Sequence, residues 1–227
     1  HRIARRQRQM CIRDSVYLKM NKKILLIFLF LIACSDGNNS ETVDNNPPRE
    51  LRAEVIVENN VFKVSYNEFK EQANWIEYKV RQITKRCDRA GMNWYTEAGV
   101  HTSDEADYRN NEWDRAHLAP AGAFTDSCEN LYQTFSFLNC TLQLNVLNQG
   151  EWAELESQVR SWANQYGTLD VRIELAFSDN SLVLQTGATV PDGYFKFITF
   201  PDDSERCFYF ENLPTNMNWD QYEITCN

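Results

Sequence analysis

The sequence is poor in three features that would assign it to common protein classes. Its longest apolar run, residues 24–33, has ten residues, whereas a transmembrane helix needs about 20, so the pattern argues against a membrane span. Its seven cysteines include no CxxC pair, which argues against a zinc site. Only three histidines occur, at positions 1, 101 and 117, so few positions can supply an imidazole that titrates near neutral pH.

The N-terminus, in contrast, carries the pattern of an export signal. Residues 1–19 have six basic residues and no apolar periodicity, and we interpret them as non-native upstream sequence. Met20, two lysines and the apolar run then predict a signal peptide over residues 20–33. The letters LIAC at its end resemble the bacterial lipobox, which predicts a lipidated Cys34 and, with Ser35 after it, an outer-membrane lipoprotein. A simple secretory signal with a chance cysteine is the alternative.

Residues 34–50 predict a disordered tether, because Val43 is their one apolar side chain after the cysteine. The folded domain is therefore expected to span residues 51–227, a length that suits one core rather than two. Residues 1–33 hold eight of the 23 basic and one of the 32 acidic residues, so the remaining chain has 15 basic against 31 acidic residues, a net charge of −16. A charge of this sign repels nucleic acid at long range and argues against a polyanionic partner.

The cysteines of the expected domain predict disulfides, since export leads to an oxidising compartment. Their number is odd, so one stays unpaired, and Cys207 with Cys226 is the pairing that we favour. The five cysteines are Cys87, Cys128, Cys140, Cys207 and Cys226.

Alternating apolar side chains predict a mostly antiparallel sheet. In residues 61–66, for example, Phe62, Val64 and Tyr66 share one face. The pair Asn59-Asn60 before this strand predicts a hairpin turn with positive φ. The expected strands cover residues 54–57, 61–66, 75–80, 171–177, 194–200 and 207–210.

One strong helix is expected over residues 149–166, where six apolar side chains recur at helical spacing. Gly167 stands where a C-terminal cap belongs. At the other end Asn148 is a good N-cap, with Glu151 as its capping-box partner. The fold class is therefore α+β, a mostly antiparallel sheet flanked by helices.

Two blocks about 30 residues apart carry a family resemblance: ADYRNNEWDRAHLAPAGAF (106–124) and LNQGEWAELE (147–156). With them the chain resembles the DNA/RNA non-specific endonucleases of the His-Me finger (ββα-metal) superfamily, over roughly residues 61–198. The first block looks like the DRGH motif of that family and the second like its metal-binding helix. The resemblance implies a ββα-metal active-site motif and Mg²⁺-dependent hydrolysis of phosphodiester bonds in DNA and RNA, with Mn²⁺ as a substitute ion.

Phosphodiester hydrolysis explains these residue types. It needs a base for the attacking water, and a neutral imidazole with a pKa near 6.5 suits that role at neutral pH. It also needs a hard cation beside the phosphoryl oxygens, and Mg²⁺ takes few protein oxygens. The resemblance implies that His117 is the base and that Asn148 is the direct metal ligand.

The same resemblance implies three supporting roles. Arg115 would contact the phosphate, which its planar guanidinium fits better than lysine. Asn139 would help to hold the metal site. Glu156 lies about 12 Å along the helix from Asn148, so it would act on metal-bound water or on Arg115 rather than ligate the same ion. Asp114 is interpreted as a structural residue.

Each of these residues also has an ordinary interpretation. His117 alone could be a half-buried structural histidine, and Asn148 alone could be only a helix cap. Arg115 could form an ion pair with Asp114 or with a surface carboxylate. The presence of both blocks favours the active-site roles.

Several positions depart from the family pattern. Ala116 replaces a glycine, Leu138 replaces a serine, and Met92 stands where the family has an arginine, for which Arg89 is the nearby substitute. The family also continues past Asn227, so a fragment is an alternative to a complete domain. The cleft could still present a positive face through Lys85, Arg86, Arg89 and Arg115.

These departures and the acidity leave two other functions open. One is a catalytically weakened relative that acts as an envelope binding module. The other is a carbohydrate-binding lipoprotein or adhesin, which gives no reason for WDRAHLAP.

Overall fold

A seven-stranded antiparallel sheet organises residues 49–226, which this computed structural model describes. The earlier predictions for residues 1–19, the signal peptide, Cys34 and nearly all of the tether lie outside the described residues. The order of strands in the sheet is β1-β2-β3-β6-β7-β8-β9. These strands are β1 (Val55–Glu58), β2 (Phe62–Asn67), β3 (Gln72–Val80), β6 (Leu169–Ala176), β7 (Gly193–Thr199), β8 (Glu205–Glu211) and β9 (Glu223–Ile224).

The first hairpin confirms the predicted strands but not the predicted turn conformation. β1 and β2 pair antiparallel, with Val57 opposite Val64. Neither Asn59 nor Asn60 has a positive φ. Instead, the side-chain oxygen of Asn59 accepts hydrogen bonds from the backbone N–H groups of Val61 and Phe62, which closes the turn without a left-handed residue.

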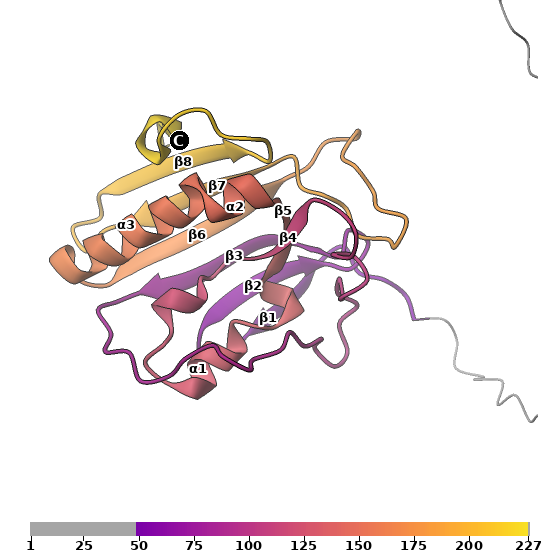
Figure 1. Cartoon of the computed structure of the whole chain (residues 1–227), viewed down its shortest axis with the longest axis horizontal. Coiled ribbons are helices and arrows are strands. Elements are labelled where there is room, and N and C mark those ends of the chain that lie inside the picture. Colours follow the sequence, from indigo (N-terminus) through magenta and orange to yellow (C-terminus); the bar gives the residue numbers. More distant parts are fainter. Residues whose placement is uncertain (1–48, 227) are drawn as a thin grey trace, which may run out of the picture. The chain divides into compact units, whose positions relative to one another are not determined.

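The main core lies between one face of the sheet and helix α3 (Glu151–Tyr166). The apolar stripe of α3 is buried through Trp152, Leu155 and Val159, and the ring of Trp152 packs 5.4 Å from that of Tyr194 in β7. Figure 1 shows α3 running along the sheet beside β6 and β7. The helix ends as predicted at Gly167, whose φ of 104° favours glycine.

A second, two-stranded sheet supplies the strand–strand–helix succession that the family resemblance implies. Strands β4 (Trp113–His117) and β5 (Cys140–Leu144) pair antiparallel, with His117 opposite Cys140. The chain passes from β5 directly into α2 (Asn145–Gln149) and then into α3. The remaining short helices are η1 (Ala121–Ala123), α1 (Cys128–Gln133), η2 (Phe137–Asn139) and η3 (Trp219–Tyr222).

The prediction that Asn148 caps the long helix is wrong. Helical structure already begins at Asn145, and Asn148 lies within α2. The residue before α3 is Gly150, and it forms no side-chain cap. A Cβ at Gly150 would lie 2.6 Å from the carbonyl oxygen of Val146, so the tight junction between α2 and α3 requires glycine.

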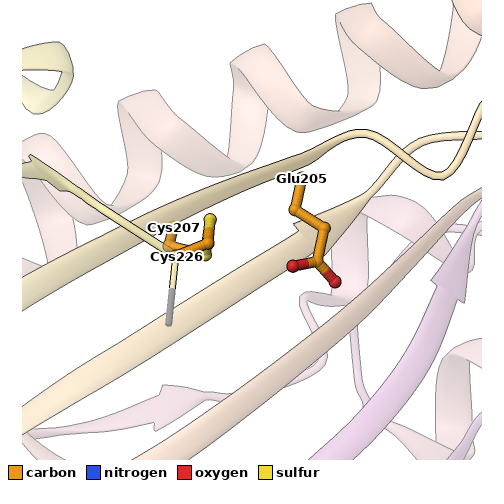
Figure 2. Close-up of side chains that lie close together, drawn as sticks. All are labelled: Glu205, Cys207 and Cys226. Carbon is orange, nitrogen blue, oxygen red and sulfur yellow. A yellow bond between two sulfur atoms is a disulfide. The ribbon is translucent and has the colours of Figure 1, made fainter.

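Residues 49–226 contain two disulfides, Cys207–Cys226 and Cys87–Cys128, and within this part of the chain Cys140 is buried and unpaired. The favoured pairing and the odd cysteine are thus confirmed. Figure 2 shows Glu205 beside the first disulfide. Disulfide sulfurs are not thiolates, so this group of three does not form a metal site. Among the described residues, the helices are too short or too polar to cross a bilayer.

Candidate active site

A cleft of about 690 Å³ opens where β4 meets α2 and the first turns of α3. Four of the five predicted site residues line it: Arg115, His117, Asn148 and Glu156. A larger hollow of about 880 Å³ over β2, β3 and β6 contains none of them, so we take convergence of polar groups rather than size as the guide to the site.

Asp114 of β4 fixes the orientation of Asn148 in α2. The amide nitrogen of Asn148 donates to Oδ2 of Asp114 at 2.9 Å, and the amide of Gln149 donates to the same oxygen at 2.7 Å. Within residues 49–226 the amide oxygen of Asn148 accepts no hydrogen bond. That oxygen is the atom a hard cation would take, and the contact with Asp114 prevents the amide from flipping it away.

His117 ends β4 in an apolar setting that keeps its ring neutral. The imidazole lies 4.6 Å from the ring of Trp94 and meets Phe135 edge-on at 4.9 Å. Burial, with a smaller contribution from the charge of Arg89, lowers the pKa of His117 to about 3. Nε2 is buried without a partner in the described chain. Nδ1 is neither hydrogen-bonded there nor buried in this way, so it is the nitrogen that water in the cleft can reach.

Asn139 is fully buried and lies outside the cleft lining. Its side-chain oxygen accepts from the N–H of Ala119 at 2.7 Å, and its amide nitrogen donates to the carbonyls of Ala119 and Thr134 at 2.9 and 2.8 Å. All its side-chain groups are therefore engaged by backbone, at Ala119 just after His117 and at Thr134. The side chain of Asn139 thus connects these two backbone segments and does not face the cleft.

Arg115 forms an ion pair with a carboxylate that was not predicted from the sequence. Its Nη1 donates to both carboxylate oxygens of Glu105 at 2.6 Å, and no ion pair with Glu156 or Asp114 is present among the described residues. Both partners are partly exposed, with 40% and 47% of their side-chain surfaces accessible. Such exposed pairs are weak, so a phosphate can compete for the guanidinium.

Comparison with known proteins identifies the family of this chain. The model of the DNA/RNA non-specific endonuclease family (Endonuclease_NS) matches residues 38–227. The chain belongs to this family. A nuclease of Serratia marcescens is 26% identical over 227 aligned residues, which cover 90% of this chain and 84% of that protein. Human mitochondrial endonuclease G is 38% identical over 99 residues, or 41% of this chain and 33% of that protein.

A solved structure of the EndoG/EndoGI complex has the same fold, with a TM-score of 0.68 at 18% identity, covering 78% of this chain and 82% of that one. This likeness confirms the α+β fold with a ββα-metal motif. As a member of a metal-dependent nuclease family, the protein is a hydrolytic endonuclease with nucleic acid as its substrate.

Two arginines extend the cleft of this endonuclease beyond Arg115. Arg89 lines the cleft, and its charge contributes to the lowered pKa of His117. Arg160 was missed by the sequence analysis. A Cβ on Gly122, which lines the cleft, would lie 3.5 Å from Nη1 of Arg160. Its position one turn after Glu156 on the same helix was the available signal.

Proposed function

We propose that this endonuclease hydrolyses DNA and RNA with little sequence preference, using His117 as general base and one Mg²⁺ ion held by Asn148. The observation that carries the proposal is the contact between Asp114 and Asn148, because it presents a free amide oxygen in the same cleft as a neutral imidazole. Hard oxygen ligands of this kind fit Mg²⁺, and Mn²⁺ would fit the same atom.

Asn148 would hold the ion through its amide oxygen, with Asp114 keeping that oxygen in place. When bound, the ion would neutralise charge on the phosphoryl oxygens and on the leaving oxygen. Asn148 is the one direct protein ligand in this proposal, since Glu156 lies eight residues further on, in α3 rather than in α2, and makes no hydrogen bond with Asn148 in the described chain. Waters and phosphate oxygens would complete the coordination, which is the usual condition for Mg²⁺.

His117 would take the proton of the attacking water on Nδ1, while Nε2 carries the resident proton. The water oxygen would bond to phosphorus as the bond from phosphorus to the 3′ oxygen breaks. The 3′ oxygen would leave as an alkoxide that takes a proton from solvent water, and a 5′-phosphate end would result. Burial lowers the pKa of His117 and so makes it a weaker base. The negative phosphate that enters the cleft would stabilise the imidazolium and offset this effect. Trp94 and Phe135 hold the ring plane, and Asn139 holds the backbone behind it.

The cleft arginines answer the objection raised by the acidic composition. Arg89 and Arg115 line the cleft, and Arg160 lies beside it. Lys85 instead pairs with Asp88 outside the lining, so it adds little to a positive face. Arg115 would leave Glu105 to contact the phosphate, and Glu156 would accept a hydrogen bond from metal-bound water. Exposed charges elsewhere are screened within about 8 Å at physiological salt.

The test is incubation of the full chain with plasmid DNA and with RNA, in Mg²⁺ or in EDTA. We expect cleavage of both in Mg²⁺, none in EDTA, and loss of cleavage in His117→Ala. The rival candidate, a binding module, is prompted by Met92 and by the engaged Arg115. It would bind both nucleic acids with the same affinity in wild type and in His117→Ala and would cleave neither. Unchanged turnover in His117→Ala would contradict the assigned base.

For localisation, we propose export under the signal of residues 20–33, with lipidation of Cys34 and tethering through residues 34–50 to the outer membrane. The support is the order of charge, apolar run and cysteine in the sequence. Palmitate labelling of cells that express the chain should mark the wild type and not Cys34→Ser. Equal labelling of both would contradict lipidation at this residue.

A further inference from the structure

A lysine lies in the main core without a conventional partner. Lys196 of β7 points to the inner face of the sheet, between Ile173 of β6 and Phe208 of β8, and none of its surface is exposed. Its Nζ makes no hydrogen bond, and no carboxylate in residues 49–226 lies within ion-pair distance. Buried lysines are rare unless they are paired.

The nearest group to this ammonium is the indole of Trp152 in α3, with 3.7 Å between Nζ and the ring centroid. Glu156 lies one turn further along the same helix, where it lines the cleft. The indole N–H of Trp152 makes no hydrogen bond within residues 49–226, and its proximity lowers the pKa of the Glu156 carboxyl. Trp152 therefore separates a cation in the core from an acid at the cleft.

Lys196 and Glu156 influence each other across this ring. Burial is the largest effect on each and opposes charge: it raises the pKa of Glu156 and lowers that of Lys196 to about 8. Each charge then counteracts the effect of burial on the other. Without a cation beneath it, a carboxyl in this position would tend to hold a proton at neutral pH.

We propose that Lys196 is a positioning residue that acts from within the core, across Trp152, to keep Glu156 ionised at the edge of the cleft. The inference rests on the proposed function of Glu156 as an acceptor for metal-bound water, because only the ionised carboxylate has both oxygens free to accept.

A purely structural role explains Lys196 less well. Methionine or leucine would fill a similar volume between Ile173 and Phe208 without burying a charge. An ammonium that makes no hydrogen bond is a cost to the fold, so its presence calls for an electrostatic reason. The charged and titratable groups around Glu156 are Lys196 of β7, Arg160 of α3, Tyr78 of β3, and, in the cleft lining, Arg89, Asp114, Arg115 and His117.

The direct test is the titration of Glu156 by carboxyl ¹³C NMR in the full chain with EDTA, with the signal assigned by its loss in Glu156→Gln. Lys196→Met should raise the midpoint of Glu156 by about one pH unit or more, the size expected for loss of a nearby opposite charge. Lys196→Arg should keep the wild-type midpoint. Lys63→Met removes an exposed lysine from β2 and is the matched control that should leave it unchanged. Equal midpoints in wild type and Lys196→Met would overturn the proposal.

A reciprocal measurement covers the case in which Lys196→Met does not fold. By linkage, Glu156→Gln should lower the midpoint of Lys196, followed by its side-chain ¹⁵N signal, by the amount that Lys196→Met would raise that of Glu156. An unchanged Lys196 midpoint in Glu156→Gln would also overturn the proposal.

Turnover in Mg²⁺ then tests the functional consequence. In Lys196→Met the acid limb of kcat should move to higher pH with KM unchanged, and in a Glu156→Gln background the lysine substitution should have no further effect. Multiplicative losses in the double variant would assign Lys196 a role independent of Glu156 and contradict the proposal. If the Glu156 and Lys196 midpoints move as expected but the wild type cleaves neither DNA nor RNA, the coupling is supported and the proposed function is contradicted.

Discussion

The seven-stranded sheet and the two-stranded β4–β5 sheet are both antiparallel, but they differ in where their polar side chains lie. Charged side chains of the seven-stranded sheet, such as Arg172 with Glu77, lie on its outer face, and its inner face is mainly apolar, with Lys196 and Gln72 among its buried polar side chains. The two-stranded sheet instead places Asp114 and His117 in the lining of the cleft, and the side-chain amides of Asn148 and Gln149 donate hydrogen bonds to Asp114. The main core and the proposed chemistry thus lie mostly on different sheets of one fold, with Lys196 as the proposed link between them.

The largest loss of activity is expected when the proposed general base, His117 of β4, is replaced. His117→Ala should lower kcat by about 10²- to 10⁴-fold, the usual contribution of a general base, with little loss of stability at neutral pH. Steady-state cleavage of plasmid DNA, with thermal unfolding as the control, measures both. A large fall in the unfolding temperature without a fall in turnover per folded molecule would place His117 with the structural residues.

A substitution in the core of the seven-stranded sheet should instead lower stability and leave activity unchanged. Ile76 of β3 is fully buried, and Ile76→Ala should cost about 2 to 5 kcal/mol of unfolding free energy through lost burial and a cavity. Because Ile76 does not line the cleft, kcat per folded molecule should stay unchanged. Urea denaturation gives the first quantity and cleavage well below the transition gives the second. A changed kcat in fully folded Ile76→Ala would show that the core of the large sheet also affects catalysis.

His117 also predicts how stability depends on pH. Its pKa is lowered in the folded protein from 6.5 to about 3. Between these values the unfolded chain binds a proton that the folded chain does not, so stability is full above pH 6.5 and falls as the pH drops toward 3. Urea denaturation at about pH 7 and at about pH 4.5 should show a smaller acid loss in His117→Ala than in wild type. An equal loss would mean that His117 is not desolvated.

A moderate effect is expected from the residue that orients the metal ligand. Asp114→Ala leaves Asn148 free to rotate its amide and should lower activity by about 10- to 100-fold, as is usual for groups that orient a metal ligand. Excess Mg²⁺ should restore part of the loss, because the ligand itself remains. Asp104→Ala, in a loop outside the cleft lining, is the matched carboxylate control. Loss without any rescue by Mg²⁺ would point to a different role.

The smallest effect is expected from Glu105, the partner of Arg115. Glu105→Gln releases the guanidinium and should lower KM by a few-fold at most, with kcat unchanged, since exposed pairs contribute about 0–1 kcal/mol. The difference should disappear at high salt, which screens the pair. A higher KM in the variant would show that Glu105 supports Arg115 instead of competing with phosphate.

The sequence predicted what depends on local periodicity and missed what depends on tertiary contact. Alternation located the six strands β1, β2, β3, β6, β7 and β8 but not β4, β5 or β9, and helical spacing located α3 and its end at Gly167. The capping prediction for Asn148 failed because the chain enters helix earlier, at Asn145. Phe195 and Phe197 flank Lys196, so alternation alone would favour a buried phenylalanine face there, whereas the structure buries the lysine.

The candidate site shows the same limit. The two blocks were enough to name Arg115, His117, Asn148 and Glu156, which share one cleft. No local pattern indicates that Glu105 pairs with Arg115, since the two residues are ten positions apart and the segment between them is mostly loop. It also could not show that the amide of Asn139 is fully used by the backbone around Ala119. Such pairings are set by how the loops pack rather than by any local pattern.

The central claim is that Asn148, oriented by Asp114, holds the metal ion of the cleft. Electron paramagnetic resonance of free Mn²⁺, titrated with the full chain, tests it without reference to turnover. We predict that the wild type depletes the free-ion signal, that Asp114→Ala does so more weakly, and that Asn148→Ala does not deplete it at the same concentrations. Depletion by Asn148→Ala equal to that of the wild type would contradict the account.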